Sequence, residues 1–370
     1  MFQGLPEYPW QKLKPYREIA ASYSQGAIDL SVGNPIDPTP AVIQAALDAA
    51  SDSPGYPTTW GEVSARTAVC EWYARRRKST GLSPDQVLLT IGSKEFISWL
   101  PIMLGIGAGD VVVQPRLAYT AYEVGAAFAG ADIFVGDEPN EWPENTKLIW
   151  LNSPGNPNGS VHSVEFLRRA LARARELGAV IVNDECYAEM GWIAPWDEYI
   201  PCMLDPEVTG GDITNVLSIY SLSKQSNLAG YRAAFAAGDE KLIKGLVNLR
   251  MHSGMMVPMP VQQAMVAALG DDHHVAAQKE IYRKRRDVLL PALLDYGFEL
   301  HDSEAGLYLW VTKGRNCWET IAELAQLGIV AVPGEFYGEA GQNFVRFSIT
   351  ATDPEIFDAS SRLSSYKARL

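Results

Sequence analysis

Residues 221–232 read Ser-Leu-Ser-Lys-Gln-Ser-Asn-Leu-Ala-Gly-Tyr-Arg, and they directly follow the run Asn-Val-Leu-Ser-Ile-Tyr at 215–220. The preceding run is rich in β-forming side chains, which predicts a buried strand. Lys224 therefore lies in the loop at the carboxyl end of a strand, where open α/β sheets bind their ligands. A lysine that is removed from water there becomes nucleophilic near neutral pH and can form a Schiff base with a carbonyl.

The same loop carries groups that suit a phosphate. Ser221 and Ser223 supply hydroxyl donors, and Arg232 supplies a planar guanidinium. A reactive amine beside a phosphate cradle indicates pyridoxal phosphate as the cofactor. The alternative is an exposed lysine in a serine-rich loop, and because short motifs match by accident, evidence from other parts of the chain must decide.

Composition excludes several classes of protein. The chain has 370 residues, of which 47% are hydrophobic and 20% charged, and this suits one large domain and a smaller one. Its net charge of -13 disfavours nucleic-acid binding and a basic membrane face. The N-terminus lacks the features of a signal peptide, and no uninterrupted apolar stretch reaches the ~18 residues of a membrane span. We expect a cytoplasmic protein without disulfides, because the cysteines are widely spaced: Cys70, Cys186, Cys202 and Cys317.

Strand and helix patterns alternate through the middle of the chain. Helical patterns at 95–104, 121–128 and 164–177 separate several of the apolar runs. This alternation predicts an α/β fold with a seven-stranded, mostly parallel sheet between helices. The last run follows the lysine loop without a crossover helix, so it is expected to be antiparallel. The seven predicted strands are 87–90, 111–114, 132–135, 147–151, 180–183, 216–220 and 233–237.

The two ends of the chain are expected to form a smaller α+β domain. We divide the chain into an N-terminal arm at 1–35, a large domain at 36–265 and a C-terminal small domain at 266–370. Strands at 307–311, 329–332 and 344–349 and a helix at 317–327 are predicted for the small domain. The basic runs 75–78 and 283–286 are interpreted as solvated helix faces. His273 and His274 have no third spaced ligand, so no metal site is predicted.

Three further strand ends carry groups that suit this cofactor. Gly92, Ser93 and Lys94 follow the first strand and open a helix, whose N-terminal amides can receive a phosphate. Residues 152–159 form a turn that would fix an asparagine amide at the edge of a ring. Asp184 ends the strand at 180–183, and an aspartate beside a pyridine nitrogen keeps that nitrogen protonated. Together with the lysine loop, these strand ends make a strong case.

The chain resembles the fold-type I pyridoxal-phosphate aminotransferases of class I and II, from residues 32–35 to 345–347. The spacing Ser-x-Ser-Lys-x5-Gly-x-Arg at 221–232 is similar to the lysine signature of that family. The resemblance implies that Lys224 is the Schiff-base lysine, that Asp184 pairs with the pyridine nitrogen and that Asn156 and Tyr187 hydrogen-bond the phenolic oxygen. It implies a phosphate site made by Ser93, Lys94, Ser221, Ser223 and Arg232.

The resemblance also implies roles for residues outside these loops. Tyr119 is similar to the aromatic residue that stacks on the ring. Tyr56 is similar to the residue that reaches the phosphate of the neighbouring subunit, which implies a homodimer. Arg346 is similar to the arginine that binds the substrate α-carboxylate, with help from Gly33 and Asn156. From the sequence alone, a buried arginine with a structural ion pair is an alternative for Arg346.

Two stretches narrow the resemblance to one group of aminotransferases. Residues 91–101 and 117–125 are similar to succinyldiaminopimelate aminotransferases, although Arg-Leu-Ala-Tyr at 116–119 departs from the expected turn. The implied reaction is transamination between N-succinyl-LL-2,6-diaminopimelate and 2-oxoglutarate, in lysine and diaminopimelate biosynthesis. Lys94 and Arg116 are candidates to contact the distal end of this long substrate, and a solvated role is the alternative for each.

Other activities use the same core residues. An aspartate- or aromatic-type aminotransferase, or a carbon-sulfur β-lyase, could use Lys224, Asp184 and the same cofactor. A transcription regulator built on this fold needs a DNA-binding module. The segment before residue 32 is too short for such a module, and the net charge has the wrong sign.

Overall fold

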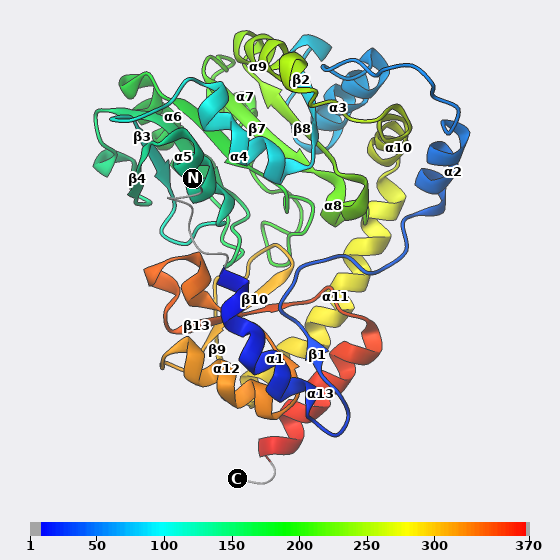
Figure 1. Cartoon of the computed structure of the whole chain (residues 1–370), viewed down its shortest axis with the longest axis vertical. Coiled ribbons are helices and arrows are strands. Elements are labelled where there is room, and N and C mark those ends of the chain that lie inside the picture. The colour runs from blue at the N-terminus through cyan, green and yellow to red at the C-terminus, as the bar shows by residue number, and fades with distance from the viewer. Residues whose placement is uncertain (1–8, 368–370) are drawn as a thin grey trace.

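The large domain is organised around a seven-stranded sheet (Figure 1). The computed structural model describes residues 9–367. Strand order is β2-β8-β7-β6-β5-β3-β4, and only β8 runs antiparallel to its neighbours. The predicted sheet and the reversed direction of its last strand are confirmed. The strands are β2 (Val87–Ile91), β3 (Val111–Gln114), β4 (Asp132–Val135), β5 (Thr146–Asn152), β6 (Val180–Asp184), β7 (Val216–Ser221) and β8 (Ala233–Gly238).

Helices cover both faces of this sheet because successive strand residues point to opposite sides. Leu88 and Leu148 pack in one core with α4 (Ser93–Met103), α5 (Ala121–Ala129) and α9 (Glu240–Ser253). Leu89 and Ile149 pack in the core on the other face. The helices of that second face are α2 (Ala41–Ala49), α3 (Val63–Arg76), α6 (Val164–Leu177), α7 (Pro206–Thr209) and α10 (Met259–Gly270).

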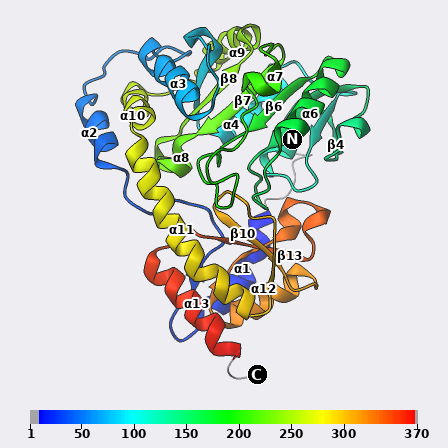
Figure 2. The ribbon, with the colours of Figure 1, turned by 180° about the vertical axis from the view of Figure 1, so that it is seen from behind.

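The small domain combines the N-terminal segment with the C-terminal part of the chain (Figures 1 and 2). Its antiparallel sheet has the order β12-β13-β10-β9, and β1 pairs in parallel with β11. The predicted strand at 329–332 is therefore wrong as a single element, because it splits into pieces of two sheets. The strands are β1 (Ile28–Asp29), β9 (Glu299–His301), β10 (Tyr308–Thr312), β11 (Ile329–Val330), β12 (Val332–Pro333) and β13 (Phe344–Ser348).

The helices of the small domain surround these sheets. The long α11 (Asp272–Asp295) descends from the large domain to the small one, and α13 (Asp353–Lys367) lies beside it (Figure 2). In the arm, α1 (Lys14–Ala21) packs on α12 (Cys317–Gln326). The divisions at residues 35 and 265 stay predictions. In the described part of the chain, no helix is both long and apolar enough to cross a lipid bilayer.

The interpretation of the two basic runs as solvated faces is only partly right. Arg75, Arg76, Lys78 and Lys284 are exposed, whereas Arg77, Arg285 and Arg286 are buried. Arg77 is buried, and its Nη2 lies 3.0 Å from Glu185 Oε2. Arg285 is also buried and forms ion pairs with Asp37 and Asp353, each at 2.6 Å. The reason is that adjacent helical residues point in different directions, so a run of four charges cannot all face water. The carboxylates come from distant parts of the chain, which a local charge pattern does not reveal.

Replacing Arg77 by alanine is expected to lower the free energy of unfolding by about 3–5 kcal/mol, because it leaves Glu185 as an unpaired buried charge. The Glu185 carboxylate would keep only neutral donors, the Met203 amide at 2.7 Å and the Asn183 side-chain amide at 3.0 Å. Denaturant unfolding measures this loss.

Arg169→Ala is the matched control for Arg77→Ala. Arg169 is half exposed and lies 3.7 Å from Glu138, and such surface pairs contribute about 0–1 kcal/mol. Equal unfolding midpoints for the two variants would contradict a structural role for the Arg77–Glu185 pair.

Candidate active site

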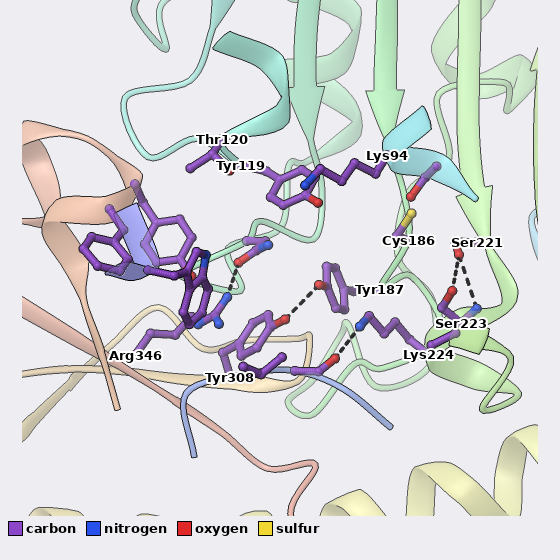
Figure 3. A pocket seen from close by; sticks show the side chains of 18 of the residues that line it. Lys94, Tyr119, Thr120, Cys186, Tyr187, Ser221, Ser223, Lys224, Tyr308 and Arg346 are labelled. Carbon is purple, nitrogen blue, oxygen red and sulfur yellow. Dashed lines mark hydrogen bonds between the residues drawn. The ribbon is translucent and has the colours of Figure 1, made fainter. Parts of the chain in front are cut away.

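A cavity of about 690 Å³ lies between the two domains (Figure 3). Its floor is the edge of the sheet where β2, β5, β6 and β7 end, and its opposite wall comes from β10, β13 and the N-terminal arm. Tyr56 is 97% exposed and does not line this cavity. The other predicted site residues all do: Gly33, Ser93, Lys94, Tyr119, Asn156, Asp184, Tyr187, Ser221, Ser223, Lys224, Arg232 and Arg346. The structure thus brings them together, while their individual roles stay predictions.

Lys224 points into the cavity from the short helix α8 (Leu222–Gln225), which follows β7 directly. Its ammonium donates a hydrogen bond to the carbonyl oxygen of Gly33 (Figure 3). A side chain at residue 33 would collide with the hydroxyl of Tyr308, so the close approach of this backbone requires glycine. The amine is therefore held at the junction of the two domains.

Asp184 is a buried carboxylate at the end of β6. Burial raises its pKa, although hydrogen bonds to its oxygens oppose the shift. The Tyr122 hydroxyl donates to Oδ2 at 3.0 Å, and the Cys186 amide donates to Oδ1 at 3.2 Å. A buried carboxylate in this position would be stabilised by a ligand that brings a positive charge into the cavity. A protonated pyridine nitrogen is such a partner, so the site fits pyridoxal phosphate at this edge.

The opposite part of the sheet edge forms an anion cradle. Gly92 has a φ of 75° and starts α4, leaving the first amides of that helix without intrahelical acceptors. The guanidinium of Arg232 occupies the space where a side chain at residue 92 would lie. The Ser221 hydroxyl caps α8 at 3.3 Å from the Ser223 amide and lies 2.9 Å from the Ser223 hydroxyl. Helix amides, hydroxyls and a guanidinium together fit a phosphate dianion.

Arg346 on β13 is buried and held by neutral partners. Nη1 donates to Asn156 Oδ1 at 2.8 Å, and Nη2 donates to the Ser31 carbonyl at 2.7 Å. Its guanidinium carbon lies 3.8 Å from the ring centre of Tyr308. Within residues 9–367 it forms no ion pair, and its Nε has no hydrogen-bond partner. An oriented guanidinium without a carboxylate can receive the carboxylate of a ligand.

The two candidate residues for the distal end of the substrate behave differently. Lys94 lines the cavity and reaches toward Tyr119 (Figure 3). Arg116 does not line it; its Nε lies 3.8 Å from Asp137 Oδ2 on the surface. The candidate role of Arg116 is therefore not supported, because its side chain turns to a local carboxylate.

Sequence reasoning missed several residues that line the cavity or contact its lining. Tyr122, which binds Asp184, lies one helical turn after Tyr119, and this spacing could have indicated it. Cys186 lies between Asp184 and Tyr187 and also lines the cavity. The aromatic residues of the outer wall gave no local signal, because they come from the small domain and the arm: Trp10, Tyr308, Phe336 and Tyr337.

Fold and site together define a pyridoxal-phosphate-dependent transferase. A family profile described as "Aminotransferase class I and II" matches residues 25–363. The chain belongs to this family, is an aminotransferase and uses pyridoxal phosphate.

Named relatives extend over nearly the whole chain. It is 50% identical to the 4-dedimethylamino-4-oxo-anhydrotetracycline transaminase OxyQ of Streptomyces rimosus, over 97% of this chain and 99% of the relative. It is 32% identical to the LL-diaminopimelate aminotransferase of Aquifex aeolicus, over 98% and 97%. The solved structure of a "probable N-succinyldiaminopimelate aminotransferase" from Thermus thermophilus superposes with a TM-score of 0.85 at 26% identity, covering 96% of this chain and 99% of the other.

Proposed function

We propose that the protein transfers the α-amino group of N-succinyl-LL-2,6-diaminopimelate to 2-oxoglutarate, as a step of lysine and diaminopimelate biosynthesis. The observation that carries this proposal is the lining of the cavity, which includes Arg346 and, on the arm, Lys14 and Arg17. Arg17 already pairs with Asp29 at 3.1 Å, so Lys14 is the arm residue left to bind a distal carboxylate. A long donor with carboxylates at both ends fits such a cavity. The diaminopimelate aminotransferases among the relatives support the same class of substrate.

The residues of the chain have distinct roles in this reaction. When bound, pyridoxal phosphate supplies a carbonyl carbon that reacts with amines and a ring that accepts an electron pair. Lys224 Nζ takes the α-proton from the donor and returns a proton during the same half-reaction. Asp184 keeps the ring nitrogen protonated, and Tyr187 and Asn156 bind the phenolic oxygen. Arg346 holds the α-carboxylate, while the anion cradle holds the phosphate: Ser93, Lys94, Ser221, Ser223 and Arg232.

A second candidate is amination of a polycyclic ketone. The 50% identity with a transaminase of 4-dedimethylamino-4-oxo-anhydrotetracycline favours it. The outer wall of the cavity carries Trp10, Phe336 and Tyr337, and flat aromatic side chains suit a fused-ring substrate. Trp10 and Phe336 meet edge to face, with ring centres 5.8 Å apart.

A panel of substrates separates these candidates. We expect glutamate to accumulate from 2-oxoglutarate with N-succinyl-LL-2,6-diaminopimelate, faster than with unsubstituted LL-diaminopimelate, aspartate or phenylalanine. Amination of the anhydrotetracycline ketone without turnover of diaminopimelates would favour the second candidate. Pyruvate and a thiol from a cystathionine-type donor would instead identify a β-lyase.

Lys14→Ala tests the distal contact within the same panel. We expect KM for the succinylated donor to rise about 2- to 5-fold, since an exposed ion pair contributes at most about 1 kcal/mol. The side chain of Lys14 is 80% exposed. KM for aspartate, which is too short to reach the arm, serves as the internal control; an equal rise for both donors would contradict a distal contact.

We propose that the protein is a homodimer in which Tyr56 contributes to the phosphate site of the neighbouring subunit. Exposure of 97% for a tyrosine in a loop supports an intermolecular partner. Sedimentation equilibrium tests the dimer. Tyr56→Phe is expected to weaken pyridoxal-phosphate binding about 10- to 100-fold, because a hydrogen bond to a charged group contributes about 1.5–3 kcal/mol. Unchanged cofactor affinity would contradict the shared site.

We propose a cytoplasmic location for this enzyme. Its four cysteines are all free thiols, which suits a reducing compartment. Cell fractionation with an antibody against the protein tests the location.

A further inference from the structure

The hydroxyl groups of two buried tyrosines meet inside the cavity. Tyr187 Oη and Tyr308 Oη lie 3.1 Å apart, and their ring centres are 5.7 Å apart at an angle of 66° (Figure 3). Tyr187 follows β6 in the large domain, whereas Tyr308 begins β10 in the small domain. The space for the Tyr308 hydroxyl exists because residue 33 is glycine. The hydrogen bond therefore joins the two domains directly beside Lys224.

The 3.1 Å contact alone leaves the donor open, because either hydroxyl can donate. Each phenol has a single hydrogen, so Tyr308 must donate to the oxygen of Tyr187 whenever Tyr187 gives its own hydrogen to a ligand in the cavity. Burial raises the pKa of Tyr187. Burial acts on Tyr308 in the same direction, but the positive charges of Arg346 and Lys224, together with hydrogen bonds to Tyr187 and Arg346, outweigh it and lower the pKa of Tyr308. The other titratable groups that face Tyr308 are the phenols of Tyr119, Tyr282 and Tyr337.

This direction frees the hydrogen of Tyr187. A phenol that already accepts a hydrogen bond must aim its own hydrogen elsewhere, and Tyr187 lines the cavity. Accepting a bond also polarises the O–H group and makes it a stronger donor, since chained hydrogen bonds reinforce one another. The acceptor in the proposed function is the phenolic oxygen of the cofactor.

We propose that Tyr308 is a positioning residue that acts through Tyr187: its hydroxyl turns the Tyr187 hydrogen into the cavity and strengthens the bond to the phenolic oxygen of the cofactor. This inference rests on the proposed place of Tyr187 at that oxygen. A stronger bond to a negatively charged oxygen removes electron density that would otherwise hold a proton on the Lys224 nitrogen of the holoenzyme. Tyr308 therefore lowers the pKa of that nitrogen, which leaves more of it unprotonated near neutral pH.

The test is a spectroscopic pH titration of the holoenzyme without substrate. The visible absorption of the bound cofactor reports the pKa of the Lys224 nitrogen. In Tyr308→Phe, we expect this pKa to rise by about 0.5 to 1 pH unit. The range follows because a net hydrogen bond contributes about 0.5–1.5 kcal/mol and one pH unit corresponds to 1.36 kcal/mol. Retained visible absorption shows that this variant still folds and binds the cofactor. An unchanged pKa would overturn the proposal.

Three further variants test how Tyr308 acts. Tyr337→Phe is the matched control, because Tyr337 lines the same cavity and its ring centre lies 5.0 Å from the Arg346 guanidinium. Its hydroxyl makes no hydrogen bond within residues 9–367, so the pKa of the Lys224 nitrogen should not change in this variant. Tyr187→Phe should raise the pKa further than Tyr308→Phe, and the double variant should match Tyr187→Phe alone.

The outcomes distinguish failure of this inference from failure of its premise. Additive shifts in the double variant would show that Tyr308 acts independently of Tyr187 and would overturn the inference. A shift in Tyr187→Phe without one in Tyr308→Phe overturns only the role of Tyr308. No shift in Tyr187→Phe overturns the place of Tyr187 as well. None of these readouts depends on the identity of the substrate.

Discussion

Lys224→Ala is expected to abolish transamination with every donor. Proton transfer by a positioned group contributes about 10² to 10⁴ in rate, and the alanine variant loses the covalent attachment of the cofactor as well. Single-turnover measurements at saturating donor give the loss. Borohydride treatment of the parent protein should fix the cofactor, and a tryptic map should place it on Lys224.

The control for this experiment is Lys241→Ala. Lys241 is exposed in the first turn of α9, on the large domain but outside the cavity, so its loss should leave the rate unchanged. The assignment of Lys224 as the Schiff-base lysine is wrong if the map places the cofactor on another lysine. It is also wrong if Lys224→Ala keeps a rate within about tenfold of the parent, because losing proton transfer should cost a factor of at least about 10².

Asp184→Asn is expected to lower kcat by roughly 10²- to 10³-fold at saturating cofactor. The asparagine keeps the shape and one hydrogen-bond acceptor but loses the charge that holds a proton on the ring nitrogen. Removing one partner of a buried charge pair costs about 3–5 kcal/mol, and 1.4 kcal/mol is a factor of ten. Steady-state kinetics of the reconstituted variant measure the effect.

Two companions of Asp184→Asn sharpen the interpretation. Asp132→Asn, on the exposed edge strand β4, controls for the general loss of a carboxylate. Tyr122→Phe removes the 3.0 Å hydrogen bond to Asp184 but keeps its charge, so its effect on kcat should be much smaller. A loss in Tyr122→Phe as large as that in Asp184→Asn would mean that orientation, rather than charge, dominates.

The fold and the inner part of the site could be predicted from sequence because both follow local rules. Strands β2, β5, β6 and β7 are largely apolar, buried runs, and the polar residues at their carboxyl ends meet because these strands end at one edge of the sheet. Asp184 and Lys224 lie far apart in the sequence, yet the strand pattern alone predicts that they share a cavity. The helix start after Gly92 followed the same logic. The short helix α8, which carries Lys224, was instead expected to be a loop, because four residues are too few to show a helical pattern.

The outer part of the site could not be predicted in this way. Tyr308 reaches Tyr187 across 121 residues of sequence, and only the docking of two domains brings them together. Arg77 and Arg285 looked like surface charges because their carboxylate partners come from distant segments. Local patterns describe what a residue is next to in the chain, and these contacts depend on the arrangement of whole domains.

The arginine on β13 and the lysine on α8 face one cavity from different domains. Every α-amino acid has the same short spacing between its carboxylate and its amine, so in the proposed function any of them can span these two residues, whatever its side chain. Selection among donors then falls to the remote rim formed by the arm and the aromatic wall. Substitutions confined to that rim can therefore change the preferred donor while the reacting centre stays untouched.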